Sequence, residues 1–312
     1  MRFKIKLKYI DGQAIQKETP INLQNAVILI NRQAGTGKTE ALQQVIAEQF
    51  ARKGLTPAIE LVDPDLFQAA LEKAAHAPAI IIGGGDGTIR TAVEWVAGKD
   101  TLLGVLPLGT LNHFAKDLGM PDDLEEAIAA LCSGEVKKID VGEVNGHIFI
   151  NNASLGIYPL AVLLRQKIAN RLGFPKYVAM AWGFLKLFGR FPMLSLQIAQ
   201  RTVYTPLVFI GNNVYEKNPL QNAKRAALDQ GVLDVAYLRT KTRLDFLWAA
   251  LKGLIGRFED VEDLEKLEMT TLRIFSRRKR IYIALDGEVK KIDTPLYFRT
   301  RPKSLKVIVP RG

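Results

Sequence analysis

The chain has 312 residues, a net charge of +11, and 48% hydrophobic and 24% charged residues, the balance of a globular protein with ample material for a core. The length favours two domains over one. The single cysteine, Cys132, excludes an intrachain disulfide framework and a cysteine-based zinc cluster, and it favours a reducing compartment. No apolar run reaches the ~18–20 residues of a membrane span, so the sequence predicts a soluble or peripheral protein.

The positive charge is concentrated in the second half of the chain. Residues 1–140 carry 15 Lys and Arg against 18 Asp and Glu, a net of −3, whereas residues 141–312 carry 28 against 14, a net of +14. This asymmetry favours an anionic partner for the second half, such as a membrane surface, nucleic acid or phosphates. A solvated basic surface without a partner explains it equally well.

The first ten residues alternate basic and apolar side chains, which predicts a strand rather than a signal peptide. From residue 25 to about 140, near-continuous apolar strands alternate with helical patterns. This arrangement predicts a doubly wound α/β domain with a parallel sheet, whose ligand lies beyond the carboxyl ends of the strands. The expected strands are 26–31, 57–62, 79–82 and 102–107, and the expected helices are 39–52, 65–75 and 89–97, with another after residue 112.

After residue 144 short strands dominate, which predicts a largely antiparallel second domain with inserted helices. The expected strands are 147–152, 194–200, 203–211, 232–239, 271–276, 281–285, 296–299 and 304–309. The expected helices are 159–171, 177–188 and 243–257.

The strongest motif is Gly-Gly-Gly-Asp-Gly-Thr at residues 83–88, which follows a four-residue apolar strand and opens a helix. Successive glycines let the backbone approach a ligand closely. The helix N-terminus then presents free amides and a positive dipole end to a phosphate. A structural turn would hardly need four glycines, an Asp and a Thr together, so we expect a phosphate-binding loop.

Three further motifs are less specific alone. Residues 34–39 resemble a P-loop, but Arg32 stands where its first Gly is required, so a phosphate-facing turn and a plain strand-to-helix turn both stay open. Leu-Pro-Leu-Gly-Thr at 106–110 precedes a helix, and the Thr110 hydroxyl could donate to a phosphate. Asp-Gly-Glu at 286–288 is also a favoured hairpin turn.

Taken in order, five motifs resemble the diacylglycerol kinase catalytic family, which includes bacterial lipid kinases, sphingosine kinases and ceramide kinases. The resemblance covers about residues 26–310. It implies an N-terminal α/β ATP-binding domain (1–145, with a return of 300–312), a C-terminal β-sandwich lipid-substrate domain with inserted helices (146–299), and an ATP site between them. The motifs are Gly84–Thr88, Pro107–Thr110, Asn112 with Phe114, Ile139–Gly142 and Asp286–Glu288.

The resemblance also implies a role for individual residues. Glu288 corresponds to the catalytic carboxylate, the general base, and Asp86 within the glycine loop can orient the backbone or approach Mg²⁺, so both are predicted to be catalytic. Asp140 corresponds to an acidic residue tied to Mg²⁺. The predicted ATP contacts are Asn31, Gly84, Gly85, Asp86, Gly87, Thr88, Arg90, Gly109 and Thr110.

The sequence departs from the family pattern at four positions. Arg32 replaces a Pro, Arg90 replaces an Asn where it could add a phosphate contact, and His113 replaces an Asp where it could alter Mg²⁺ or substrate handling. The family's structural-metal loop has an Asp just before a Gly, where this chain has Gln230. Asp229, one position earlier, is the remaining predicted metal ligand.

Residues 159–190 combine basic and large apolar side chains without an acidic residue. Such amphipathic helices can lie in an anionic bilayer interface, although their apolar faces could simply cover the sandwich core. We therefore expect a cytoplasmic lipid kinase, peripheral at the membrane, with a lipid substrate and neither a nucleic-acid nor an evident protein partner. The alternatives are a soluble NAD or sugar kinase sharing the glycine loop, and a catalytically inactive nucleotide-binding membrane module.

Overall fold

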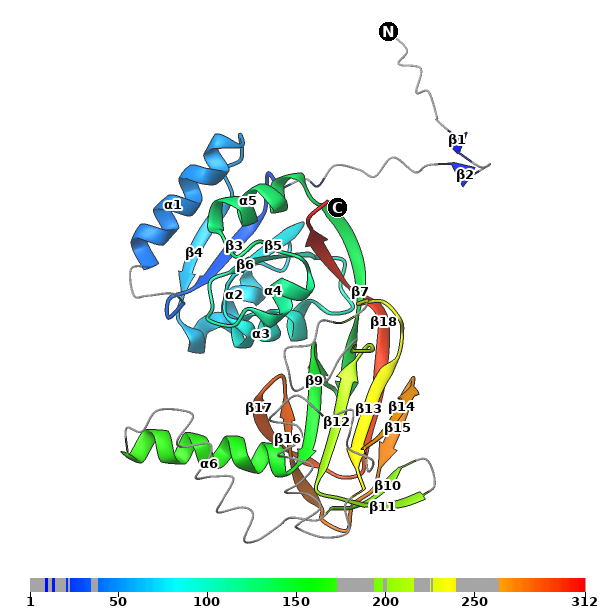
Figure 1. Cartoon of the computed structure of the whole chain (residues 1–312). Coiled ribbons are helices and arrows are strands. Elements are labelled where there is room, and N and C mark those ends of the chain that lie inside the picture. Colours follow the sequence, from blue (N-terminus) through cyan, green and yellow to red (C-terminus); the bar gives the residue numbers. More distant parts are fainter. Residues whose placement is uncertain are drawn as a thin grey trace.

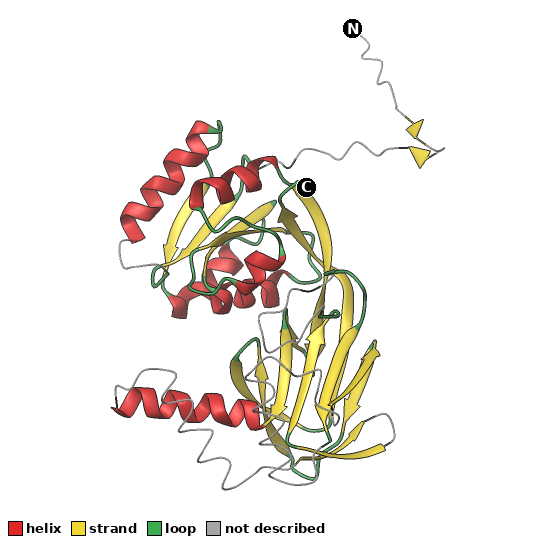
Figure 2. Cartoon of the chain, in the orientation of Figure 1, coloured by secondary structure: helices red, strands yellow, loops and turns green. Residues whose placement is uncertain are grey.

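A computed structural model describes residues 9–10, 13–14, 21, 23–34, 39–172, 194–198, 201–215, 225, 227–239 and 264–311. Two lobes follow one another, a mixed α/β lobe with helices around a sheet and a lobe dominated by β-strands (Figures 1 and 2). The predicted helices at 177–188 and 243–257, and residues 35–38 of the P-loop-like turn, lie outside the described residues.

The N-terminal lobe contains a sheet with the strand order β4-β3-β5-β6-β18-β7-β8. Four of its strands are the apolar strands predicted before residue 140. Of these, β3 pairs in parallel with both β4 and β5, and β5 pairs in parallel with β6. The chain therefore winds outward from β3 in both directions, and the sequence prediction of a parallel α/β sheet is confirmed. These strands are β3 (Val27–Asn31), β4 (Ala58–Val62), β5 (Ala79–Gly84) and β6 (Leu102–Pro107).

Helices cover the sheet because each presents an apolar face to strands that are themselves buried on both sides. All six residues of β5 are buried, and Phe50 and Phe114 from the covering helices are fully buried against this core. The helices are α1 (Thr39–Arg52), the 3₁₀ helix η1 (Pro64–Leu66), α2 (Phe67–Lys73), α3 (Asp86–Val96), α4 (His113–Asp117) and α5 (Leu124–Ser133).

A long antiparallel ribbon of β7 (Glu135–Val144) and β18 (Leu296–Val309) runs through both lobes. At its start β18 pairs with β15 (Thr271–Ile274), and near its end it pairs with β6 at Val307. Phe298 belongs to the core of the second lobe, whereas residues 305–309 belong to the core of the first. The two strands predicted at 296–299 and 304–309 are thus one strand, with a register shift between Arg301 and Leu305.

The second lobe is built on a six-stranded sheet with the order β14-β13-β12-β9-β16-β17, in which every neighbouring pair is antiparallel. It shares a core with the ribbon, where Phe149 and Phe298 meet edge to face. The prediction of an antiparallel second domain is confirmed. Its sheet strands are β9 (Asn152–Gly156), β12 (Leu207–Asn212), β13 (Leu233–Leu238), β14 (Leu264–Met269), β16 (Arg280–Leu285) and β17 (Glu288–Asp293).

The helix predicted at 159–171 is α6 (Ile157–Leu172), which begins next to β9 and β16 and projects away from the second sheet (Figure 1). Within the described ranges, no helix is long and apolar enough to cross a bilayer. The remaining strands are β1 (Tyr9–Ile10), β2 (Gln13–Ala14), β8 (His147–Phe149), β10 (Leu194–Ile198) and β11 (Arg201–Thr205).

Candidate active site

The glycine loop ends β5 and starts α3. Gly85 is the N-cap residue of α3, in an extended conformation, and no side chain caps the helix there. The backbone amides of the first turn therefore lack a side-chain acceptor, and they stand at the positive end of the helix dipole. This end of α3 suits a phosphate group.

The two glycine-containing loops touch backbone to backbone. A Cβ atom added at Gly109 would lie 2.4 Å from the Cα of Gly85, and one added at Gly84 would lie 2.8 Å from the Cβ of Thr88. A side chain at Gly109 would therefore force the loops apart, and one at Gly84 would displace Thr88 within its own loop. The sequence placed these loops at the same sheet edge, and the structure brings them into contact.

Two asparagine side chains hold the loops in shape. Asn31, at the end of β3, donates from Nδ2 to the hydroxyl of Thr88 at 2.7 Å. Asn112 has a left-handed backbone (φ 52°), and its Oδ1 accepts from the amide of Gly109 at 2.9 Å while its Nδ2 donates to the carbonyl of Pro107 at 3.1 Å. Thr110, inside the loop that Asn112 braces, stays exposed.

Asp86 links the first loop to α4. It is the first residue of α3, and its Oδ1 accepts from the backbone amide of Phe114 at 3.2 Å. The side chain is only partly buried, which leaves the carboxylate facing the surface of the site. His113, the first residue of α4, is likewise partly buried.

The Asp-Gly turn between β16 and β17 is held by its own carboxylate. Asp286 and Gly287 both have positive φ (47° and 85°), as a tight two-residue hairpin turn requires. The Asp286 carboxylate accepts from three successive backbone amides, those of residues 150, 151 and 152, at 2.8, 2.7 and 3.0 Å. Burial raises the pKa of Asp286, and these three amides oppose that shift. The turn is thereby pinned to the start of β9.

Glu288 follows this turn and reaches the first turn of α3. A Cβ atom added at Gly87 would lie 3.4 Å from Glu288 Oε1. The other carboxylate oxygen is ion-paired with Arg90, 198 positions earlier in the chain. With 51% of its side chain exposed, Glu288 stays open to a reactant. The predicted base and the predicted phosphate loop therefore meet across the two lobes.

Two family models match this chain. Residues 25–144 match the diacylglycerol kinase catalytic domain, and residues 159–309 match the YegS C-terminal NAD kinase beta sandwich-like domain. The chain belongs to the diacylglycerol kinase family. Members of this family are phosphotransferases with an alcohol acceptor, so the chain is a lipid kinase by family.

Curated relatives cover most of this kinase. A Pseudomonas aeruginosa protein named "Probable lipid kinase YegS-like" is 29% identical over 92% of this chain and 94% of its own length. A Chromohalobacter salexigens protein of the same name is 30% identical over 67% and 69%. A Bacillus subtilis diacylglycerol kinase is 29% identical over 79% and 83%.

A solved structure of a diacylglycerol kinase from Bacillus anthracis superposes on this kinase with a TM-score of 0.66 at 20% identity. The match covers 92% of this chain and 97% of that one, and it shows a shared fold.

The loops of this kinase fit a nucleotide triphosphate, as family membership implies. The uncapped N-terminus of α3 and the side-chain-free approach at Gly84 and Gly109 leave backbone amides as the natural phosphate ligands. A hollow of about 370 Å³ opens next to this edge of the sheet, at the carboxyl end of β4. Its lining includes Arg32, Asp63 and Lys73 but no residue of either glycine loop.

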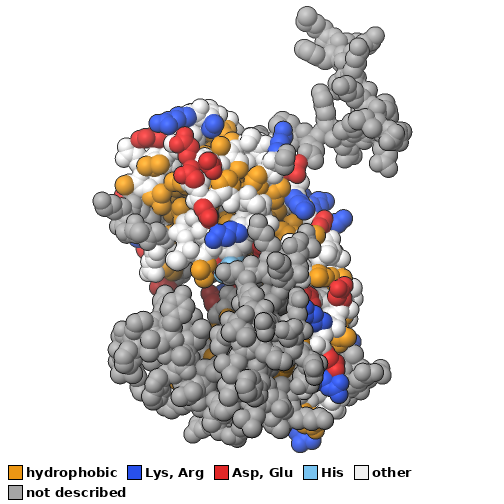
Figure 3. Space-filling model, viewed as in Figure 1, with side chains coloured by type: hydrophobic (Ala, Val, Ile, Leu, Met, Phe, Trp, Pro, Cys, Tyr) orange, Lys and Arg blue, Asp and Glu red, His pale blue; other side chains and the backbone are white. Residues whose placement is uncertain are grey.

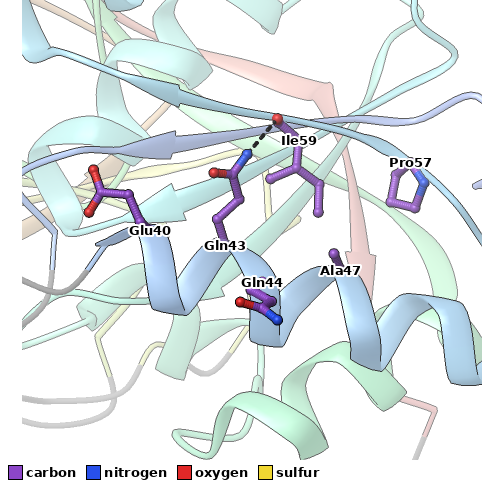
Figure 4. A pocket seen from close by; sticks show the side chains of 6 residues that line it. All are labelled: Glu40, Gln43, Gln44, Ala47, Pro57 and Ile59. Atoms are coloured by element: carbon purple, nitrogen blue, oxygen red, sulfur yellow. Dashed lines mark hydrogen bonds between the residues drawn. The ribbon is translucent and has the colours of Figure 1, made fainter.

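A second hollow of similar size lies between α1 and the edge strand β4 (Figure 4). Gln43 donates there to the carbonyl of Ile59 at 3.0 Å, and none of the predicted site residues lines it.

The predicted metal ligands Asp140 and Asp229 make no recorded contact with the glycine loops or with Glu288. Asp140 is 1% exposed, and its two carboxylate oxygens accept from the backbone amides of Gly231 and Lys303, both at 2.7 Å. Asp229 is exposed, while Gln230 accepts from the amide of Val214 through its own side chain. The described residues contain no group of three His, Cys, Asp or Glu side chains suited to a metal. Metal binding by these two residues stays a prediction.

We expect Asp140→Asn to lower the free energy of unfolding by about 1.5–3 kcal/mol. The asparagine side chain has one acceptor oxygen, whereas the carboxylate of Asp140 provides one oxygen to each of two backbone amides. Urea unfolding measures this loss, which we expect equally with EDTA and with Mg²⁺. Asp229→Asn is the control and should match the wild type, because Asp229 is an exposed residue of the loop whose Gly231 amide binds Asp140. A loss for Asp140→Asn that appears only with Mg²⁺ would contradict this structural role.

Sequence reasoning missed a buried ion pair between the lobes. The Arg225 side chain is 1% exposed, and its Nη2 lies 2.7 Å from Oδ2 of Asp117 at the end of α4. Its Nη1 donates to the carbonyl of Ile150 at 2.7 Å, the residue whose amide binds Asp286. The partners lie 108 positions apart, and no motif or spacing in the sequence indicated the pair.

Proposed function

We propose that this protein transfers the γ-phosphoryl group of ATP to a hydroxyl group of diacylglycerol or a related lipid, with Glu288 as the general base. The observation that carries the proposal is the position of the Glu288 carboxylate against the first turn of α3. A carboxylate beside a phosphate-binding helix terminus repels the nucleotide, and a catalytic role would explain why one stands there.

Phosphoryl transfer requires alignment and charge neutralisation more than covalent help. In this proposal the amides at the start of α3 hold the ATP phosphates, and Gly109, whose own amide donates to Asn112, leaves room for them to approach. Thr88 and Thr110 donate from their hydroxyl groups. Asn31, which binds the Thr88 hydroxyl, fixes that group's direction.

Mg²⁺ would supply positive charge for the β- and γ-phosphates. It keeps several water ligands and needs only one or two carboxylates when phosphates share its coordination, so no cage of protein ligands is required. Asp86 is the carboxylate of the glycine loop and is the residue we propose to hold Mg²⁺ there. Its hydrogen bond to the amide of Phe114 uses one oxygen and keeps the side chain in place.

Glu288 would accept the proton of the attacking lipid hydroxyl, a contribution typically worth ~10²–10⁴-fold in rate. The proton acceptor must lie on the side of the γ-phosphate from which the hydroxyl arrives. Because Glu288 belongs to the second lobe, the proposal brings the lipid from that lobe or from the membrane it touches.

We expect the protein to bind anionic vesicles, and the binding to weaken as salt rises. The +14 net charge of residues 141–312 motivates this, because attraction between exposed charges is screened beyond ~10 Å at 0.1 M salt. The described surface visible in Figure 3 carries positive and negative side chains on both lobes. The attraction would therefore come from the net positive charge and not from one visible patch. Co-sedimentation with vesicles is the measurement, and equal binding to neutral and anionic vesicles at every salt concentration would refute the electrostatic contribution.

A soluble NAD or sugar kinase is the second candidate. The C-terminal family model is described as NAD kinase beta sandwich-like, which is a likeness of fold and not of acceptor. ATP turnover with and without lipid vesicles separates the two, because only the lipid kinase requires vesicles. A protein without turnover on any acceptor would instead be a nucleotide-binding membrane module.

A further inference from the structure

The Glu288 side chain has one polar partner within the described residues, the guanidinium of Arg90. Glu288 is half exposed, and an exposed Glu side chain samples several rotamers unless a partner holds one of them. Arg90 is the opposite case, since 6% of its side chain is exposed. A fixed, buried cation therefore sets the position of an otherwise free carboxylate.

Arg90 is itself fixed by a second carboxylate. Its Nη1 lies 3.4 Å from Oε2 of Glu94, one turn further along α3. Glu94 in turn faces Nζ of Lys290 in the second lobe at 3.8 Å and Nδ1 of His147 on β8 at 3.7 Å. Lys290 and Glu288 are two positions apart and so lie on one face of β17. The charges alternate, and β17 is attached to α3 at two points.

This arrangement leaves few hydrogen-bond donors of Arg90 available to a nucleotide. Its Nη1 and Nη2 are committed to carboxylates, and its Nε is buried without a partner. To reach a phosphate the guanidinium would have to leave Glu288. The geometry thus differs from the phosphate contact that the sequence suggested for Arg90.

We infer that Arg90 is a positioning residue that holds Glu288 on α3, the helix whose N-terminus would hold the ATP phosphates. The base and the phosphoryl donor then share one rigid element as their common frame, although Glu288 belongs to the other lobe. Their separation is set by α3 and not by the angle between the lobes, and a misplacement of about 1 Å can cost ~10²-fold in rate. The inference rests on the proposed role of Glu288 as the base.

The test is a double-mutant cycle on lipid phosphorylation, with Arg90→Met, Glu288→Gln and the double variant. Arg90→Met keeps the length of the side chain and removes the charge. We expect it to lower kcat by ~10–10²-fold with the KM for ATP within about twofold of wild type. On the Glu288→Gln background we expect it to change kcat by less than about threefold, because a residue that acts through Glu288 has nothing left to position.

Arg90→Lys is the conservative variant. It keeps the charge but offers a single ammonium in place of the two guanidinium nitrogens, so we expect kcat between those of the wild type and Arg90→Met. It also takes over the cycle if Arg90→Met does not fold, since its effect should likewise vanish on the Glu288→Gln background.

Arg280→Met is the matched control. Arg280 pairs with Asp293 at 2.6 Å at the other end of the same β16–β17 hairpin, and both side chains are exposed. Removing that pair should leave kcat within about twofold of wild type. This result would show that loss of an arginine–carboxylate pair elsewhere in the hairpin does not by itself lower kcat.

The outcomes are distinguishable. An equal loss on both backgrounds, or a KM for ATP raised tenfold or more, would mean that Arg90 serves the nucleotide directly and would overturn the inference. Loss of turnover in Glu288→Gln together with wild-type turnover in Arg90→Met would overturn it while leaving the proposed function intact. Full turnover in Glu288→Gln would overturn the proposed base itself.

Discussion

Glu288→Gln is expected to lower lipid phosphorylation by at least ~10²-fold while leaving ATP affinity within about twofold of wild type. The amide is nearly isosteric with the carboxylate and leaves both glycine loops untouched, but it cannot accept the hydroxyl proton at neutral pH. Nucleotide affinity and lipid phosphorylation, measured on one purified sample, give both numbers.

Glu268→Gln is the control for this variant, because Glu268 is an exposed glutamate on the edge strand β14 of the same sheet. It should retain wild-type turnover. Full activity in Glu288→Gln would reduce Glu288 to a replaceable residue after a turn, with only Asp286 and Gly287 needed for folding. The search for a base would then return to Asp86.

Asp86→Ala is the second variant for which we expect a large loss, at least ~10²-fold in turnover, the size of effect seen when one preorganised electrostatic contact is removed. The fold should survive. The one hydrogen bond lost, from the amide of Phe114 at 3.2 Å, is worth about 1.5 kcal/mol or less. Steady-state turnover and thermal unfolding of the purified variant measure both effects.

The control for Asp86→Ala is Asp123→Ala. Asp123 also stands at a helix start and accepts from a backbone amide, that of Glu126 at 3.0 Å, but it caps α5 away from the loops. Its loss should cost ~1 kcal/mol of stability and no activity. Near-normal turnover in Asp86→Ala would remove the glycine loop from the mechanism.

Local patterns were sufficient to predict the four parallel strands β3 to β6 of the first sheet. β5 is apolar throughout and buried, so its sequence indicates a parallel strand without any tertiary information. The missed strands include β14 and β17 at the two edges of the second sheet, and also the long strand β7 and the inner strand β9. Edge strands carry charged side chains that prevent further pairing, and such sequences do not alternate like half-buried strands.

Part of the candidate site could likewise be predicted from the sequence, and part could not. The two glycine loops could be paired from sequence, because the carboxyl ends of neighbouring parallel strands lie at one edge of the sheet. The contact of Glu288 with Arg90 could not be predicted from the sequence. It depends on the hydrogen bonds by which Asp286 fixes the hairpin turn to residues 150–152. The position of Arg90 one turn into α3 indicated a phosphate contact. Only the packing of the second lobe against that helix shows that Arg90 pairs with a carboxylate.

The central claim is the transfer of phosphate from ATP to a lipid hydroxyl, and one measurement tests it most directly. The full chain and its Glu288→Gln variant are incubated with γ-labelled ATP, Mg²⁺ and vesicles containing diacylglycerol, phosphatidylglycerol or a long-chain base, and with NAD and sugars in parallel reactions. Mass spectrometry then identifies the labelled product. We predict a phosphorylated lipid from the wild type and at least ~10²-fold less from the variant. Label found in NAD or a sugar with none in any lipid would contradict the account.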